Sequence, residues 1–365
     1  MSGIKKIKYN GIDRLYDDYS WRLTRRAKNV WSSGLVLTGR DNKQSERYKL
    51  EKKLQSYTKR KYALITQNCT DALYFVLNAY GINKGSKIIC PAYSFIATAT
   101  AIKRTGAQIQ WVDVDANGQI GDLKFCQKPN AVVYVNLFGN LADYTRLRNY
   151  CDENRIPLIE DAAQSFGAYY RKIPSGRLGD TSVLSFSPTK NLPAFGNGGA
   201  VLTDSEMIAE RVKSLRYHGT GGLPVPYGYN SVMSEDHCAQ VGFLLDKYKK
   251  LQKRRAKLRE RYDDNLRRYT FYPLSTQKDT ISSNHKYVIR VDDRDKLKQY
   301  LLSKGIETQV HYERPMPHTP FFASTYAFPN AEKLSREALS LPLYPHLKES
   351  EVDYVCEQLI KFYGF

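Results

Sequence analysis

Short apolar runs recur between residues 60 and 205, and helical or loop stretches separate them. The runs are rich in β-branched and other apolar residues, and each is short enough to be a buried strand. They cover residues 62–65, 87–90, 107–112, 131–136, 157–160, 182–186 and 199–203. Strands that alternate with helices are typical of a mainly parallel sheet with helices on both faces. The sequence therefore predicts an α/β fold around a seven-stranded, mainly parallel sheet.

An acid and an amine lie at the ends of two of these runs. Asp161 closes the run 157–161, and Lys190 follows the run 183–189. In open α/β sheets, ligands bind outside the carboxyl ends of the strands. This pair suits pyridoxal phosphate (PLP), because the amine can form a Schiff base and the carboxylate can keep the pyridine nitrogen protonated. A structural Asp–Lys ion pair at the sheet edge fits these two residues equally well.

Phosphate groups bind at helix starts, where backbone N–H groups are free. A helix is predicted over 72–80, with Gly81 at its end, because the apolar residues follow helical spacing. Asn68, Thr70 and Asp71 precede or open this helix, and all three are helix-capping residue types. An ordinary capped helix explains the same pattern without a phosphate. Ser185 and Asn230 are further candidates for phosphate contacts, although no local signal marks them.

A flat heterocycle is commonly bound by an aromatic ring stacked on its face. The segment 91–98 follows the apolar run 88–90, so it also emerges from a strand end. Phe95 and Tyr93 are its candidate stacking residues, and either could equally be part of the core.

Taken together, these segments resemble the DegT-type family of PLP-dependent sugar aminotransferases, within the aspartate-aminotransferase fold group. The resemblance covers nearly the whole chain, and order and spacing agree. The two most specific blocks are Ile-Glu-Asp-Ala-Ala-Gln-Ser-Phe-Gly-Ala at 159–168 and Ser-Phe-Ser-Pro-Thr-Lys-Asn at 185–191. The other matching blocks are 68–73, 91–98, 112–115, 179–180, 198–200, 229–230 and 341–345.

The resemblance implies a type I PLP-dependent transferase fold and a role for each matching residue. Lys190 would form the Schiff base, and Asp161 would pair with the pyridine nitrogen. Phe95 would stack on one face of the ring and Gln164 would lie on the other. Relatives with His in place of the lysine perform dehydration, so Lys190 favours aminotransfer.

The resemblance also implies the phosphate and substrate contacts. Thr70, the backbone of Asp71, and Ser185 match phosphate contacts. Asn230 matches a residue that reaches the phosphate of a neighbouring subunit, which implies a homodimer with shared active sites. Family members place substrate contacts near His311 and Tyr312, although a loop histidine without a role fits His311 as well. Arg216 and His218 are similarly ambiguous.

Three positions depart from the family pattern. Cys69 stands where glycine is common, Ser187 replaces a His or larger residue, and the stretch 219–228 is short and idiosyncratic. The last two bear on the choice of substrate and not on the cofactor.

Two domains are expected, because 365 residues exceed one typical domain. The large PLP-binding domain would span 1–245, with the segment before residue 45 wrapping it or its partner. A small C-terminal α+β domain would span 246–365, with strands at 286–291 and 308–312 and a helix near 294–304. A long charged helix after residue 240 would link the two.

Composition limits the remaining possibilities. No apolar run is long enough to span a bilayer and the start of the chain has no hydrophobic signal core, so we expect a cytoplasmic protein without a membrane partner. The six cysteines are scattered without metal-ligand spacing, which indicates reduced thiols and no metal site. They are residues 69, 90, 126, 151, 238 and 356.

The net charge of +19 is high for a metabolic enzyme. The basic stretch 247–259 could be a nucleic-acid footprint, but its apolar spacing indicates a mostly solvated amphipathic helix. A basic surface also suits an anionic sugar nucleotide.

The expected reaction is transfer of an amino group from L-glutamate to a keto sugar attached to a nucleoside diphosphate. Two alternatives stay open: a PLP enzyme acting on a cyclitol ketone, and a basic nucleic-acid-binding protein on the same fold.

Overall fold

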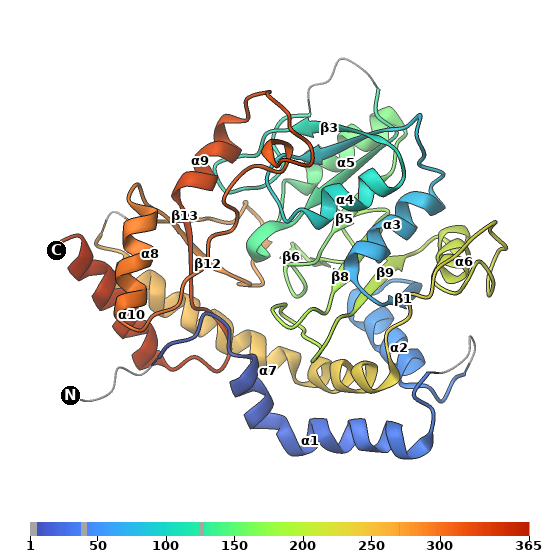
Figure 1. Ribbon diagram of the computed structural model, residues 1–365, viewed down its shortest axis with the longest axis horizontal. Helices are drawn as coiled ribbons and strands as arrows, with labels where there is room; N and C mark the ends of the chain where they lie inside the picture. The colour runs from blue at the N-terminus through green and yellow to red at the C-terminus, as the bar shows by residue number, and fades with distance from the viewer. Residues whose placement is uncertain (1–5, 38–41, 124–127, 270, 365) are drawn as a thin grey trace.

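A computed structural model describes residues 6–37, 42–123, 128–269 and 271–364 (Figure 1). Its centre is a seven-stranded sheet with the order β1-β9-β8-β5-β4-β2-β3. The strands are β1 (Tyr62–Thr66), β2 (Lys87–Pro91), β3 (Gln108–Val112), β4 (Ala131–Val135), β5 (Leu158–Asp161), β8 (Thr181–Ser185) and β9 (Gly199–Thr203). Strand β9 is antiparallel to both neighbours, and the other pairings are parallel. The predicted seven-stranded, mainly parallel sheet is confirmed.

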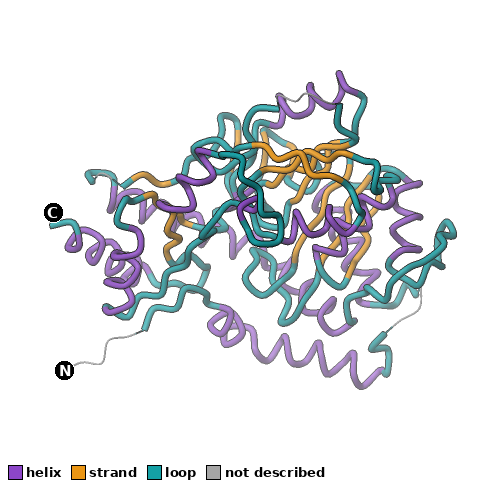
Figure 2. The backbone as a smooth tube through the Cα atoms, turned by 45° about the horizontal axis from the view of Figure 1, so that its top comes forward, coloured by secondary structure: helices purple, strands orange, loops and turns teal. Residues whose placement is uncertain are grey.

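Helices cover both faces of this sheet because successive side chains of each strand point to opposite sides. Leu64 packs in the cluster formed with α3 (Cys69–Ala79), α4 (Ala97–Arg104) and α6 (Glu206–Leu215). Its neighbours Ala63 and Ile65 pack in the opposite cluster with α1 (Ile12–Ser33), α2 (Glu46–Thr58) and α7 (Glu235–Leu266). On that second face, α5 (Tyr144–Asn154) covers β4 and β5. Figure 2 shows the strands gathered between these helices.

The C-terminal part forms a second, smaller unit around an antiparallel sheet of order β10-β12-β13. Its elements are β10 (Tyr272–Pro273), β12 (Tyr287–Arg290), α8 (Arg294–Ser303), α9 (Pro329–Glu337), β13 (Ala338–Leu341) and α10 (Glu349–Phe362). The predicted strand at 286–291 and the helix near 294–304 are confirmed. Three minor strands, β6 (Tyr169–Tyr170), β7 (Ile173–Pro174) and β11 (Thr280–Ile281), form a third sheet, and two 3-10 turns lie at Leu137–Gly139 and Met316–His318.

The predicted strand at 308–312 is wrong. Only Gln309 pairs with a strand: its backbone exchanges hydrogen bonds of 3.1 and 2.8 Å with Ser340. Beyond it the carbonyl of His311 and the backbone N–H of Tyr312 bond the hydroxyl of Tyr93, so the ladder ends after one residue pair.

Helix α7 connects the two units (Figure 1). Its first half packs in the core of the large unit through Val241 and Leu244, and its second half packs in the core of the smaller unit through Leu258 and Tyr262. The predicted domain boundary at 245/246 falls inside this helix, and the division remains a prediction. Helix α1 runs beside α7 and packs in the core of the large unit through Leu15 and Leu23.

The basic stretch 247–259 lies within α7, and three of its cations, Arg254, Lys257 and Arg259, form ion pairs. Arg254 and Lys257 contact Glu349 of α10 at 2.5 and 2.9 Å. Tyr248, Leu251 and Leu258 of the same stretch are buried. The predicted amphipathic helix is therefore confirmed, and part of its polar face binds α10.

Five of the six cysteines are free thiols, and Cys126 lies outside the described residues. Within the described residues, no helix is both long and apolar enough to cross a membrane.

Candidate active site

Asp161 and Lys190 meet at the carboxyl edge of the sheet, as the sequence predicts. Asp161 is the last residue of β5, which pairs in parallel with β8, and Lys190 lies in the turn that follows β8. Both line a cavity of about 530 Å³. Burial raises the pKa of the Asp161 carboxyl and lowers the pKa of the Lys190 amine, because each charged form loses hydration.

Two donors orient the Asp161 carboxylate. The Thr98 hydroxyl donates to Oδ2 at 2.8 Å, and the backbone N–H of Ala163 donates to Oδ1 at 3.1 Å. The Lys190 amine has no hydrogen bond or ion pair with any of the described residues. One side of the cavity therefore carries the oriented carboxylate of Asp161 and the amine of Lys190, which is free to bind a ligand.

The start of helix α3 forms a second side of the cavity. Asn68 is its N-cap: the Asn68 Oδ1 accepts from the backbone N–H of Asp71 at 2.7 Å. Cys69 and Thr70 line the cavity, and among the described residues their backbone N–H groups have no acceptor. These are the groups that a helix start offers to an anion.

Asp71 itself does not line the cavity. Its carboxylate accepts from Ser231 at 2.8 Å and pairs with Arg104 at 2.7 Å, and its backbone N–H is taken by the cap. The predicted backbone contact of Asp71 to a phosphate therefore remains a prediction, and the free amides lie one and two residues earlier.

Close backbone packing shapes the floor beneath this helix start. A Cβ atom added to Gly199 would lie 2.5 Å from the carbonyl carbon of Asn68 and 2.6 Å from the amide nitrogen of Cys69. Only glycine allows β9 to approach α3 this closely. Gly198 and the predicted phosphate residue Ser185 line the cavity beside it.

The two aromatic candidates of the 91–98 segment have different positions. Phe95 lines the cavity with 54% of its surface exposed, whereas Tyr93 is fully buried. The Tyr93 hydroxyl donates to the carbonyl oxygen of His311 and accepts from the backbone N–H of Tyr312 at 2.7 Å. Tyr93 is thus a core residue that positions the 311–312 segment.

Gln164, His311 and Tyr312 all line the cavity, and their contacts with cofactor and substrate remain predictions. Gln164 accepts from the Phe138 backbone N–H and donates to the Tyr312 hydroxyl, both at 3.0 Å. The His311 Nδ1 lies 2.9 Å from the Ser340 hydroxyl. Burial, and then the nearby cations of Lys286 and Lys190, lower the pKa of His311 well below its usual value.

Asn230 lies apart from these residues. It is exposed and does not line the cavity, and its backbone forms an isolated bridge with Tyr217. The ambiguous Arg216 is structural: it is buried and pairs with Glu51 at 2.7 Å.

Thr98 and Lys286 are among the cavity residues that sequence reasoning missed. Thr98 belongs to the matching block 91–98 but carries no signal of its own as a threonine in a helix. Lys286 is the first residue of the predicted strand 286–291. A lysine directly before apolar strand residues is a signal that could have marked it as a site candidate.

Solved structures share this fold over almost the whole chain. DesV of S. venezuelae, in complex with a ketimine intermediate, covers 99% of this chain and of its own, with a TM-score of 0.93 and 28% identity. The PLP form of Spr1654 from Streptococcus pneumoniae covers 92% of this chain and 94% of its own, with a TM-score of 0.83 and 26% identity. The fold and site thus define a PLP-dependent aminotransferase.

The family follows from the sequence as a whole. The model of the DegT/DnrJ/EryC1/StrS aminotransferase family matches residues 21–360, and the chain belongs to this family. A pleiotropic regulatory protein of Geobacillus stearothermophilus is 34% identical over 86% of this chain and 88% of its own. A UDP-2-acetamido-2-deoxy-3-oxo-D-glucuronate aminotransferase of Pseudomonas aeruginosa is 30% identical over 85% of this chain and 89% of its own.

Proposed function

We propose that the protein transfers an amino group from L-glutamate to the keto group of a sugar attached to a nucleoside diphosphate. The observation that carries the proposal is the cavity in which Asp161, Lys190 and the start of α3 face one another. The relatives' names support the acceptor class, since the Pseudomonas aeruginosa protein is named for a UDP-linked 3-oxo sugar.

The residues of the cavity fit PLP by the chemistry of their donors. The free amides of Cys69 and Thr70, with Ser185, would hold the phosphate. The carboxylate of Asp161 would accept from the protonated ring nitrogen. Phe95 would cover one face of the ring and Gln164 the other, and Lys190 would bind the aldehyde carbon.

When bound, the cofactor supplies a ring that accepts electrons from the carbon that loses its proton. The chain supplies the proton transfers and the charge that favours them. The Lys190 amine, whose pKa burial lowers, would take the proton from the substrate carbon and return it to the cofactor carbon as general base and then acid. Asp161 would keep the ring nitrogen positive throughout, and Thr98 and Ala163 would hold Asp161 in place.

We also propose that the active enzyme is a homodimer in which Asn230 reaches the phosphate site of the neighbouring subunit. Two observations support this. Asn230 is exposed on a loop, and Phe95 leaves 54% of its surface uncovered beside the cavity. A second subunit seated there would complete the site.

Substrate profiling tests the reaction. Purified enzyme would be supplied with L-glutamate and a panel of nucleotide-linked keto sugars, with a cyclitol ketone included, and 2-oxoglutarate would be measured. We expect a nucleotide-linked keto sugar to give turnover and the Lys190→Ala variant to give none. Turnover with the cyclitol ketone alone would reject the proposed acceptor, and turnover by Lys190→Ala near the wild-type rate would reject the role of Lys190.

Subunit complementation tests the shared site. Asn230→Ala and Lys190→Ala are each expected to be impaired, but a mixed dimer contains one site with both residues intact. Random exchange should restore up to about one quarter of wild-type activity, because half of the dimers are mixed and each has one of two sites whole. If exchange is confirmed and Asn230→Ala is impaired alone, an absence of recovery would place the whole site within one chain.

A further inference from the structure

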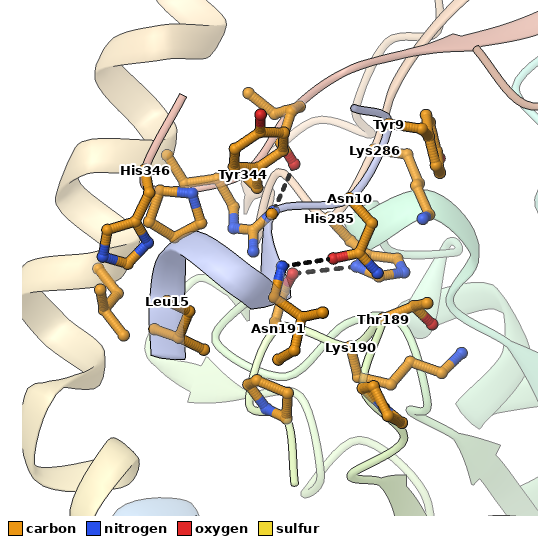
Figure 3. Close-up of a pocket in the computed structure, with 18 residues that line it drawn as sticks. Tyr9, Asn10, Leu15, Thr189, Lys190, Asn191, His285, Lys286, Tyr344 and His346 are labelled. Atoms are coloured by element: carbon orange, nitrogen blue, oxygen red, sulfur yellow. Dashed lines mark hydrogen bonds between the residues drawn. The ribbon is translucent and has the colours of Figure 1, made fainter. Parts of the chain in front are cut away.

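The Lys286 side chain lies at the junction of two cavities. It precedes β12, and its backbone N–H donates to the Phe138 carbonyl at 3.2 Å. It lines both the 530 Å³ cavity and a smaller one of about 50 Å³, which Figure 3 shows. Its Nζ lies 4.7 Å from the centroid of the Tyr9 ring, a cation–π contact that holds the amine in place. In Figure 3 the amines of Lys190 and Lys286 both lie on the side away from Leu15 and His346.

Positive charge dominates the described surroundings of Lys286. Among the described residues, Asp161 is the sole acid that lines the larger cavity, and the smaller cavity is lined by no acid. Arg255 is buried at the smaller cavity, where its Nη1 donates to the Leu343 carbonyl at 2.8 Å. Burial, and then the cations of Lys190 and Arg255, lower the pKa of Lys286 well below its usual value. The Lys286 amine therefore lacks an anion that would stabilise its charge.

The proposed reaction gives the Lys286 amine no role. Asp161 would be paired with the ring nitrogen, Lys190 would be engaged at the reacting carbon, and the phosphate would lie at the start of α3. Lys286 remains as an amine without a counter-ion, and it faces the space for the substrate. Charge on this amine is costly while it is unpaired in a desolvated site, and an anion bound beside it would stabilise the protonated form.

The size of the site selects the kind of anion. The smaller cavity behind Lys286 has room for a terminal group of a few atoms. A diphosphate bound there would have to be followed by its nucleoside, for which the cavity has no room. A carboxylate is a terminal group, so it fits this space. In an amino acid or a sugar acid it also lies within a few bonds of the reacting carbon.

We propose that Lys286 is a carboxylate-binding residue of the active site, which recognises the carboxylate of the amino donor or of an acidic sugar acceptor. The inference rests on the proposed function and names the charge by which that site selects its substrates. Arg255 and the Tyr9 ring are positioning groups: Arg255 adds positive potential, and Tyr9 orients the amine.

Three variants test the proposal. Lys286→Met removes the charge and keeps the length of the side chain, and Lys286→Arg keeps the charge. Lys304→Met is the matched control, because Lys304 also lies over a tyrosine ring, with its Nζ 5.1 Å from the centroid of Tyr300, but lines neither cavity. Thermal unfolding of each variant would verify that it is folded.

Binding is measured first, without turnover. Glutarate, an unreactive dicarboxylate, and its neutral diamide would be titrated calorimetrically into the protein free of cofactor. We expect wild type, Lys286→Arg and Lys304→Met to prefer glutarate, and Lys286→Met to bind it about 10- to 100-fold more weakly.

The two half-reactions of the loaded enzyme then identify the source of the carboxylate. A loss of kcat/KM for L-glutamate in Lys286→Met assigns the carboxylate to the donor. A loss confined to an acceptor with a carboxyl group, relative to the same sugar with a hydroxymethyl group, assigns it to the acceptor. Both results support the proposal.

Equal glutarate binding and equal half-reaction rates in Lys286→Met and Lys304→Met would overturn the role of Lys286. So would wild-type protein that binds glutarate and its diamide equally. Failure of the proposed function would give a different result. In that case the donor half-reaction would still depend on Lys286, but no nucleotide-linked keto sugar would be accepted.

Discussion

The hydroxyl of Thr98 donates a hydrogen bond of 2.8 Å to Oδ2 of Asp161. Thr98 lies in the first turn of α4 and Asp161 ends β5, so this bond joins the helical layer to the carboxyl edge of the sheet. Both residues are buried, so the bond is shielded from bulk solvent. The carboxylate is thereby held in one orientation before any ligand arrives.

Replacing Thr98 with valine tests that orientation. Valine keeps the shape of threonine but donates nothing, so the carboxylate should become less well aligned. We expect kcat/KM to fall about tenfold, the effect of one lost hydrogen bond to a charged group. Steady-state kinetics would measure it. Thr100→Val is the control, because the Thr100 hydroxyl bonds only the carbonyl of Ala97 in its own helix, and an equal loss in both variants would contradict the role of Thr98.

Asp161→Asn should fold normally, because the amide is nearly the same size as the carboxylate. It cannot stabilise a protonated ring nitrogen, so we expect the rate to fall roughly a hundredfold or more. Single-turnover absorbance changes with L-glutamate would measure the rate. Asp152→Asn, an exposed change on α5, should leave it unaltered, and full activity of Asp161→Asn would make Asp161 a structural residue.

Glu160 should control stability and not the chemistry. Its carboxylate is fully buried and accepts from five donor groups at 2.7 to 3.1 Å. These are the side chains of Asn136, Ser175 and Ser182 and the backbone N–H groups of Gly176 and Leu178. Glu160→Gln would point an amide donor at these donors, so we expect a loss of about 3 kcal/mol in the free energy of unfolding. Urea unfolding would measure it against Glu153→Gln, an exposed change that should have little effect.

The pH dependence of cofactor capture should report the Lys190 amine. Only the neutral amine attacks the aldehyde, and burial lowers the pKa of Lys190 below 10.5 while the Asp161 carboxylate opposes the shift. The capture rate should therefore rise with pH and reach half its maximum below the value for N-acetyl-lysine with the same aldehyde. Stopped-flow absorbance from about pH 6 to about pH 10 would measure it. In Asp161→Asn the midpoint should move lower still, and a midpoint equal to that of the free amine would contradict the burial effect.

Local patterns were sufficient to predict the sheet and the residues at its edge. Each of the seven strands begins and ends within one residue of its predicted limits, and Asp161 and Lys190 lie where the strand ends place them. Contacts between distant segments were not predictable in this way. The bond from Thr98 to Asp161 and the position of Lys286 between two cavities both depend on tertiary packing.

The wrong strand at 308–312 has the same cause. Its residues suit a strand, but the Tyr93 hydroxyl binds the peptide group between His311 and Tyr312, and Gln164 binds the Tyr312 side chain. Tertiary contacts with the large unit thus outweigh the local preference for a longer ladder.

The alternation of side chains along β5 makes any shift in the pairing register of this strand destabilising. Glu160 faces a pocket of five donors and Asp161 faces the cavity, although they are adjacent in the chain. A slip of one residue that put Glu160 in the place of Asp161 would put Ile159 in the place of Glu160, and it would turn every side chain of the strand to the opposite face. The misaligned strand would leave five buried donors without their acceptor, so a chain in which Asp161 is misplaced would also be unstable. The hydrogen bonds of Glu160 thereby stabilise the strand register that places Asp161 at the cavity.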